Sequence, residues 1–176
     1  MYRQVSDGSL YQLRLAKEQS IDDDVISERM KWHLPILSQN SKCGISLDLP
    51  VAYCKPTKAC ADVCYACQGT QMFYRSIVKS LSVGRMIDAD PERVARKIID
   101  EAQGRSVRIA GSGEILPKHK SLLDFVSEFG GNWWGLPNGL KLIGYCHNSC
   151  FLSMRRLLPL FWTMSNQKFQ LTGEPT

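Results

Sequence analysis

The chain has 176 residues, of which 44% are hydrophobic and 22% are charged, with a formal net charge of +5 at pH 7. These values are ordinary for one globular domain, and they exclude a disordered or low-complexity chain. No apolar run is long enough to span a bilayer and no secretory leader is evident. We therefore expect a cytoplasmic protein without a membrane partner.

The charge is unevenly distributed along the chain. Residues 54–108 contain ten Lys or Arg against six Asp or Glu, so this part is the basic one. A basic surface can attract nucleic acid or an acidic electron donor. The alternative is an ordinary solvated surface without a partner.

The pattern predicts a single α/β domain with three parts. Residues 1–41 form an N-terminal extension, because their apolar residues follow no clean period apart from a short helix over residues 25–34. Residues 42–165 form a β/α core, and residues 166–176 form a loose polar tail. The core begins with a strand over residues 43–49, where apolar and small or polar residues alternate until Pro50.

The rest of the core alternates between helices and strands. Helices are predicted over residues 71–89, over residues 91–102 with Asp90 as the cap, and over residues 117–129, where His119 is expected to face solvent. Further strands are predicted over residues 106–109, 140–145 and 161–165, and a further helix over residues 151–158. This order implies parallel strands with right-handed crossovers, in a small open sheet or in part of a barrel.

The chemistry of the chain is concentrated between Cys54 and Gly69, in the sequence C-K-P-T-K-A-C-A-D-V-C-Y-A-C-Q-G, which holds four of the seven cysteines. Intracellular thiols stay reduced, so a disulfide framework is not expected. Closely spaced thiolates favour zinc, copper(I) or an iron–sulfur cluster. Unliganded structural cysteines are the alternative. The candidate metal ligands are Cys54, Cys60, Cys64 and Cys67.

The spacing of these cysteines favours a cluster over a single ion. Structural zinc sites usually combine two C-x2-C pairs separated by a longer loop, whereas only Cys64 and Cys67 are spaced in that way here. Four ligands within fourteen residues suit a cuboidal [4Fe–4S] cluster better than one tetrahedral ion. Zinc remains the alternative metal, because the chain offers more distant ligands. These are Cys43, Cys146, His147 and Cys150.

Cys60-x3-Cys64-x2-Cys67 resembles the C-x3-C-x2-C motif of the radical S-adenosylmethionine enzymes. The resemblance implies a [4Fe–4S] cluster held by these three cysteines, with S-adenosylmethionine on the fourth iron. It also implies that the β/α alternation builds a mostly parallel sheet in a partial (incomplete) TIM-like barrel. That family usually has an aromatic residue where Ala66 stands here. With Cys54 upstream, the segment looks closer to the phage and plasmid gene product 88 family, which implies the cytoplasm of a host cell.

A second segment extends the resemblance. The sequence G-S-G-E over residues 111–114 follows the strand predicted over residues 106–109 and looks like a variant of the G-G-E segment of radical S-adenosylmethionine enzymes. The resemblance implies that Ser112, Gly113 and Glu114 contact S-adenosylmethionine. Taken alone, G-S-G-E is a common turn.

Two functions follow from these observations. The first is a radical S-adenosylmethionine-like iron–sulfur enzyme with an unknown substrate, an electron donor and an oligomeric partner that completes the short barrel. The alternative is a non-enzymatic phage or plasmid binding protein with a structural cluster or a zinc site, for which nucleic acid is the candidate partner. The two functions differ in the role of Cys54. If it binds the cluster as a fourth ligand, no iron is left for S-adenosylmethionine; if only three cysteines bind, one iron stays open.

Overall fold

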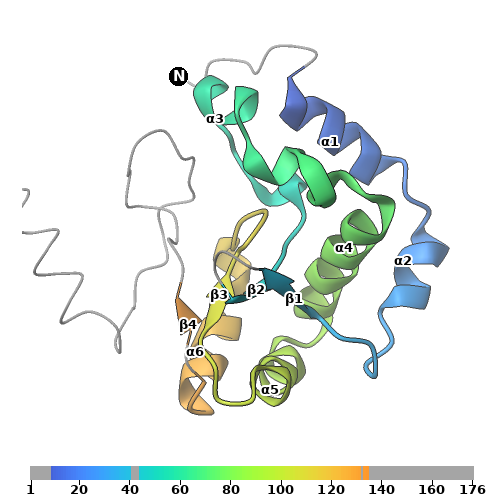
Figure 1. Ribbon diagram of the computed structural model, residues 1–176. Helices are drawn as coiled ribbons and strands as arrows, with labels where there is room; N and C mark the ends of the chain where they lie inside the picture. The colour runs from blue at the N-terminus through green and yellow to red at the C-terminus, as the bar shows by residue number, and fades with distance from the viewer. Residues whose placement is uncertain (1–8, 41–43, 132, 135–176) are drawn as a thin grey trace, which may run out of the picture.

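The computed structural model describes residues 9–40, 44–131 and 133–134 (Figure 1). The helices are α1 (Leu10–Gln19), α2 (Asp23–Arg29), α3 (Lys58–Asp62), α4 (Tyr74–Ala89), α5 (Pro91–Ala102) and α6 (Lys120–Glu128). The strands are β1 (Leu37–Asn40), β2 (Gly44–Leu47), β3 (Val107–Ile109) and β4 (Trp133–Trp134). Short 3-10 turns are η1 (Val51–Tyr53), η2 (Tyr65–Cys67), η3 (Gly69–Met72) and η4 (Pro117–His119).

The strands form a single small sheet in the order β1-β2-β3-β4. β1 runs antiparallel to β2, with Leu37 opposite Leu47. β2 and β3 are parallel, with Ile45 opposite Val107, and β3 and β4 are also parallel. The strands predicted over residues 43–49 and 106–109 are confirmed in β2 and β3, with slightly shorter bounds.

The expected mostly parallel sheet in a partial TIM-like barrel is wrong. The described part of the chain has a mixed sheet of strands two to four residues long, and helices make up most of its regular structure. β1 was not predicted, and its connection to β2 is too short for anything but an antiparallel pair. A barrel also needs longer, tilted strands that close on themselves. The strands predicted over residues 140–145 and 161–165, and the helix over residues 151–158, lie outside the described residues.

The main core lies between the sheet and the helices α4, α5 and α6. Leu47 and Ile109 of the sheet join Met86 of α4, Ile98 of α5 and Leu122 of α6 in one buried cluster, each at most 4% exposed. Burying one such side chain stabilises the fold by about 1.5–3 kcal/mol. The inward faces predicted for the helices over residues 91–102 and 117–129 are thereby confirmed.

Local signals set the beginning of α5. Asp90 caps the helix, because its Oδ1 accepts a hydrogen bond of 3.0 Å from the backbone N–H of Arg93. Pro91 occupies the first turn, where no intrahelical N–H is needed. At the other end Gln103 takes a left-handed conformation, with φ of 51°. These features fix where α4 ends and α5 turns back onto the sheet.

A second, smaller cluster lies beneath the cysteine segment. It combines Tyr11 of α1 and Val51 of η1 with Ala61, Ala66 and Cys67. α1 and α3 lie at the end of the molecule opposite to α5 and α6 (Figure 1). No helix in the described ranges combines the length and the apolar character needed to cross a membrane.

The expectation that His119 faces solvent is wrong. Its side chain is 1% exposed, with Nε2 2.8 Å from Oδ1 of Asp88 and its ring 5.2 Å from the ring of Tyr53. The turn η4 directs the imidazole under the end of α4, where Asp88 supplies a polar partner. Burial lowers the pKa of His119, although the hydrogen bond to Asp88 acts in the opposite direction.

We expect the free energy of unfolding to fall as the pH drops below about 6.5, the pKa of an unperturbed histidine. The folded pKa of His119 is below that value, so the unfolded chain binds the proton first and acidification favours unfolding. His119→Gln should lose part of this dependence in urea unfolding measured at pH 7.5 and 5.5. His33→Gln is the matched control, because His33 is exposed. Equal pH dependence in the two variants would contradict the assignment.

Candidate metal centre

The cysteine segment leaves β2 through Leu49, Pro50 and the turn η1. Cys54 follows η1, Cys60 lies in α3, Cys64 precedes η2 and Cys67 ends it. All four are free thiols; Cys67 is buried and the other three are half-buried. Thr57 begins α3 by accepting a hydrogen bond from the backbone N–H of Cys60 through its hydroxyl.

Cys64 and Cys67 form a hydrogen-bonded pair of thiols. The hydrogen bond from the Cys67 side chain lowers the pKa of Cys64 to about 6, helped by the backbone N–H groups of Ala66 and Cys67 and opposed by burial. The same hydrogen bond, together with burial, raises the pKa of Cys67. Near neutral pH Cys64 is therefore a thiolate, which is the form that binds metals, and Cys67 holds the proton.

Cys54 belongs to the same electrostatic group. Burial raises its pKa first, and the negative charges of Glu114, Cys64, Cys60 and Glu18 raise it further. Deprotonating all of the thiols would therefore bring several negative charges together with little water to screen them. A bound cation or a metal cluster would remove this repulsion.

A buried arginine of α1 provides positive charge at this centre. Arg14 is 0% exposed; its Nε donates to Glu18 Oε1 at 3.0 Å and its Nη2 donates to Ser80 Oγ at 3.3 Å. Its Nη1 is buried and has no hydrogen-bond partner among the described residues. The charge of the guanidinium helps to lower the pKa of Cys64 and opposes the rise in the pKa of Cys67, so it favours the thiolate form at both positions.

The partner of Arg14 attaches α1 to the beginning of the cysteine segment. The two carboxylate oxygens of Glu18 accept hydrogen bonds of 3.0 Å from the backbone N–H groups of Val51 and Ala52. The Tyr11 hydroxyl lies 3.3 Å from the carbonyl oxygens of both Val51 and Cys54. The chain that leads into Cys54 is therefore held by α1.

Our reading of the sequence missed the α1 residues of this site. Tyr11, Arg14 and Glu18 lie on one side of the helix, at i, i+3 and i+7. A search for apolar periodicity overlooks them because two of the three are charged, while Leu13 on the same helix is 51% exposed. The signal that could have found them is the repetition of polar or amphipathic residues at helical spacing in a segment that has no apolar stripe.

The G-S-G-E turn over residues 111–114 lies against the base of the cysteine segment. The backbone N–H of Gly111 donates to Leu47 O, that of Leu49 donates to Ser112 O, and the hydroxyl of Ser112 donates to Leu49 O, at 2.9–3.0 Å. Gly113 has φ of +66°, and a Cβ there would be 2.3 Å from the carbonyl oxygen of Pro50. Ser112 and Gly113 thus contact the protein's own backbone.

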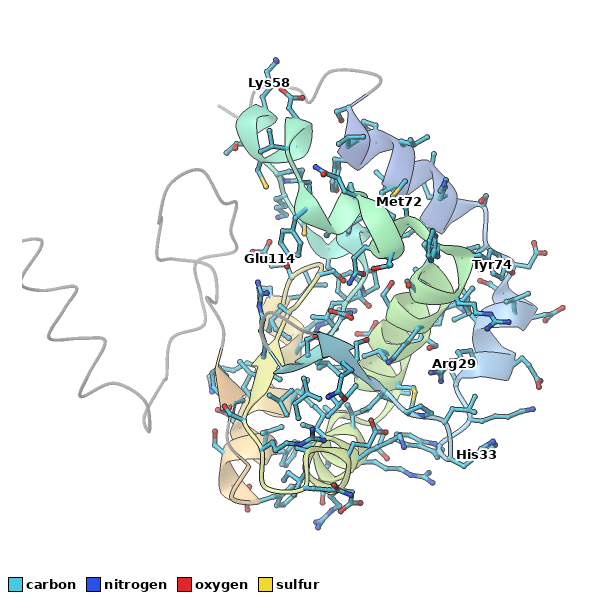
Figure 2. All side chains as sticks on the ribbon, viewed as in Figure 1. Arg29, His33, Lys58, Met72, Tyr74 and Glu114 are labelled. Atoms are coloured by element: carbon cyan, nitrogen blue, oxygen red, sulfur yellow. The ribbon has the colours of Figure 1, made fainter. Side chains whose placement is uncertain are left out.

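Glu114 connects this turn to the cysteines. Its side chain is 3% exposed and accepts a hydrogen bond from the backbone N–H of Lys55. Burial raises the pKa of Glu114 to about 8, in spite of that hydrogen bond. Figure 2 shows Glu114 in the region where the end of β3 meets the cysteine segment. Glu114 is also the residue of this turn whose charge acts on a thiol, because it raises the pKa of Cys54.

The structure does not describe the more distant candidate ligands. Cys43, Cys146, His147 and Cys150 lie outside the described residues. Within the described ranges, no three His, Cys, Asp or Glu side chains are grouped as ligands of one metal ion. The structure thus pairs Cys64 with Cys67 but does not gather all four thiols around one point. The chemistry of the donors still suits a thiolate-bound centre, because four thiols come from one segment.

Comparisons with family models, with curated proteins and with solved structures each found no match for this chain. The resemblances to radical S-adenosylmethionine enzymes and to the gene product 88 family therefore stay predictions, based on the cysteine spacing and the G-S-G-E turn.

We expect Arg14→Gln to lower the free energy of unfolding by roughly 3–5 kcal/mol, because it leaves the carboxylate of Glu18 buried without its cation. Urea unfolding under reducing conditions measures the change. Arg75→Gln is the matched control; Arg75 is exposed, so its replacement should change stability by at most about 0.5 kcal/mol. Equal effects of the two substitutions would contradict the role of the buried ion pair.

Gly113→Ala should destabilise the protein much more than Gly104→Ala. Both glycines have positive φ, so each substitution carries a backbone cost of about 1–2 kcal/mol. Only at position 113 does the new methyl group also clash, with the carbonyl oxygens of Leu49 and Pro50, whereas nothing lies within 4 Å at position 104. Thermal unfolding of the two variants compares them directly. Similar melting temperatures would show that the turn is not packed against residues 49–50.

Proposed function

We propose that residues 54–67 bind a [4Fe–4S] cluster through Cys60, Cys64 and Cys67, with Cys54 as a fourth ligand or as a neighbouring thiol. The observation that carries the proposal is the placement of four free thiols in the one short segment that follows β2, with Cys64 and Cys67 hydrogen-bonded to each other. Soft thiolates are the usual ligands of iron–sulfur centres. Once bound, such a cluster supplies one-electron transfer.

The chain's own residues support this role in specific ways. The hydrogen bond between Cys64 and Cys67 keeps one proton on the pair, and ligation by both sulfurs would release that proton. The charge of Arg14 then offsets part of the added negative charge at Cys64 and Cys67. Glu18 of α1 holds the turn before Cys54 by accepting hydrogen bonds from Val51 and Ala52, so the position at which the cysteine segment begins is fixed.

The enzymatic form of the proposal rests on Glu114. In a radical S-adenosylmethionine-like enzyme this carboxylate would accept a hydrogen bond from the ammonium group of the cosubstrate. An arriving cation would also favour the ionised form of Glu114, which burial alone disfavours. Ser112 and Gly113 would act indirectly, by fixing the turn against Leu49 and Pro50. The substrate and the electron donor stay unassigned.

One observation favours a second candidate function, a protein whose cluster or zinc ion is structural. Cys54 is coupled electrostatically to Cys60 and to Cys64, so a fourth thiol belongs to the same group. If all four thiols bind, the centre is saturated and has no position for a cosubstrate. Such a protein would retain its metal centre as part of its fold and would not bind S-adenosylmethionine.

The test is anaerobic reconstitution followed by iron, sulfide and zinc analysis and by electron paramagnetic resonance of the reduced protein. We expect about four iron and four sulfide per chain, and loss of the cluster in Cys64→Ser. Cys43→Ser is the matched control, because that cysteine lies outside the segment 54–67. About one zinc per chain without sulfide would contradict the cluster and favour the structural alternative.

Adding S-adenosylmethionine then separates the two forms of the proposal. A changed resonance spectrum indicates an open iron and supports the enzyme. An unchanged spectrum in the wild type that becomes responsive in Cys54→Ser indicates a saturated cluster with Cys54 as its fourth ligand. An unchanged spectrum in both proteins contradicts a role for S-adenosylmethionine.

A further inference from the structure

Cys64 and Cys67 are the two ends of one tight turn. The backbone N–H of Cys67 donates to the carbonyl oxygen of Cys64 at 3.0 Å, which closes the turn at η2. A turn closed in this way holds its first and last Cα atoms within about 7 Å of each other. A disulfide needs Cα atoms about 4.4–6.8 Å apart, so the backbone at η2 is compatible with one.

The two side chains also point toward each other. Their thiols are joined by a hydrogen bond, so the two sulfur atoms are neighbours in the folded chain. Spacing in the sequence alone does not ensure this, because cysteines whose Cβ vectors point apart cannot be bridged unless the backbone moves. A disulfide between these two residues therefore needs a rotation of their side chains and no rearrangement of the fold.

The two thiols differ in how well a molecule from solvent can reach them. Cys64 is half-buried and lies between Val63 and Tyr65, which are 71% and 42% exposed. Cys67 is 1% exposed and belongs to the small core cluster beneath the cysteine segment. A reagent therefore reacts with Cys64 first. An accessible cysteine beside a second, resolving cysteine is the arrangement found in redox-sensitive thiol sites.

We propose that Cys64 and Cys67 form a reversible thiol–disulfide exchange site whose substrate is a low-molecular-weight disulfide. The thiolate of Cys64 attacks one sulfur of that disulfide, a mixed disulfide forms, and the thiolate that leaves takes up the proton released by Cys64. Cys67 then gives up its proton and attacks the sulfur of Cys64, and the second thiolate leaves with that proton. The protein pair is oxidised by two electrons, and the small disulfide is reduced to two thiols.

This exchange goes beyond the proposed cluster, because it needs the two sulfurs and no iron. The thiolate is the form of cysteine that binds metals, and a sulfur in a disulfide is not a thiolate. One consequence rests on the proposed function: a bound cluster and the disulfide exclude each other, so oxidation of the pair would prevent cluster assembly. The exchange itself does not depend on whether a cluster forms.

The test uses the full chain without metal, incubated with glutathione disulfide in the absence of oxygen. Free thiols are then alkylated, and tryptic peptides are analysed by mass spectrometry. The peptide over residues 59–75 contains Cys60, Cys64 and Cys67. We expect it to lose two hydrogens and to give backbone fragments between residues 60 and 64 but none between residues 64 and 67. Dithiothreitol should reverse the change.

Two single substitutions separate the roles of the two thiols. Cys67→Ser should accumulate glutathione on Cys64, because the resolving thiol is missing. Cys64→Ser should carry less glutathione on Cys67, by roughly tenfold or more, because a buried thiol is inert. Circular dichroism checks that both variants are folded. The same two variants in urea are the matched control, in which the two amounts should become equal.

The mapping of the wild-type disulfide needs no variant, so it decides the inference even if a substitution unfolds the chain. A disulfide between Cys64 and Cys67, together with the unequal adducts in the two folded variants, supports the exchange site. A disulfide to any other cysteine, a mixed disulfide that persists on Cys64 of the wild type, or no reaction would overturn it. Equal adducts in the folded variants would do the same. Iron analysis of the reconstituted protein is a separate measurement, so failure of the proposed cluster is distinguishable.

Discussion

The structure around the cysteines depends on the buried ion pair between Arg14 and Glu18 of α1. Removing two charges from water is costly, and a buried pair is stable only if its remaining donors and acceptors are satisfied. Glu18 meets this condition fully through the backbone N–H groups of Val51 and Ala52, and Arg14 meets it in part through Ser80. The pair therefore attaches α1 to the turn before Cys54. Its hydrogen bonds are directional, so they orient the helix more precisely than contact between two apolar side chains would.

The other side of the cysteine segment is held by backbone contacts between the ends of two parallel strands. The chain after β2 and the chain after β3 exchange hydrogen bonds through Leu49 and Ser112, and Gly113 lets them approach closely. Glu114 is carried to the N–H of Lys55 as a consequence. A small mixed sheet is thus enough to bring two distant segments together, without the barrel that the resemblance implied. The position of polar groups at the carboxyl ends of parallel strands is a general property of such sheets.

Charge balance connects this architecture to the proposed chemistry. Burial raises the pKa of Cys54, and the charges of Glu114, the neighbouring thiols and Glu18 raise it further, so the centre resists additional negative charge. Cys64 is the exception, because the hydrogen bond from Cys67, with smaller contributions from backbone N–H groups and from Arg14, lowers its pKa. A metal centre would bind first where a thiolate already exists and would then displace protons from the remaining thiols.

The sequence by itself determined the features that depend on neighbours along the chain. The cap and the inward face of α5 and the strands β2 and β3 follow from local spacing, and the structure agrees for each. The alternation of apolar and polar residues did not predict burial in β2, because Ser46 on its other face is also buried. Only the tertiary structure decided the features whose partners are distant. β1 forms because β2 lies opposite it, α1 buries Arg14 and Glu18 because Ser80 and the turn at Val51 receive them, and His119 is buried because Asp88 and Tyr53 lie there. The burial of a polar residue can be predicted only when its partners are known, because a charged side chain without a partner would stay in water.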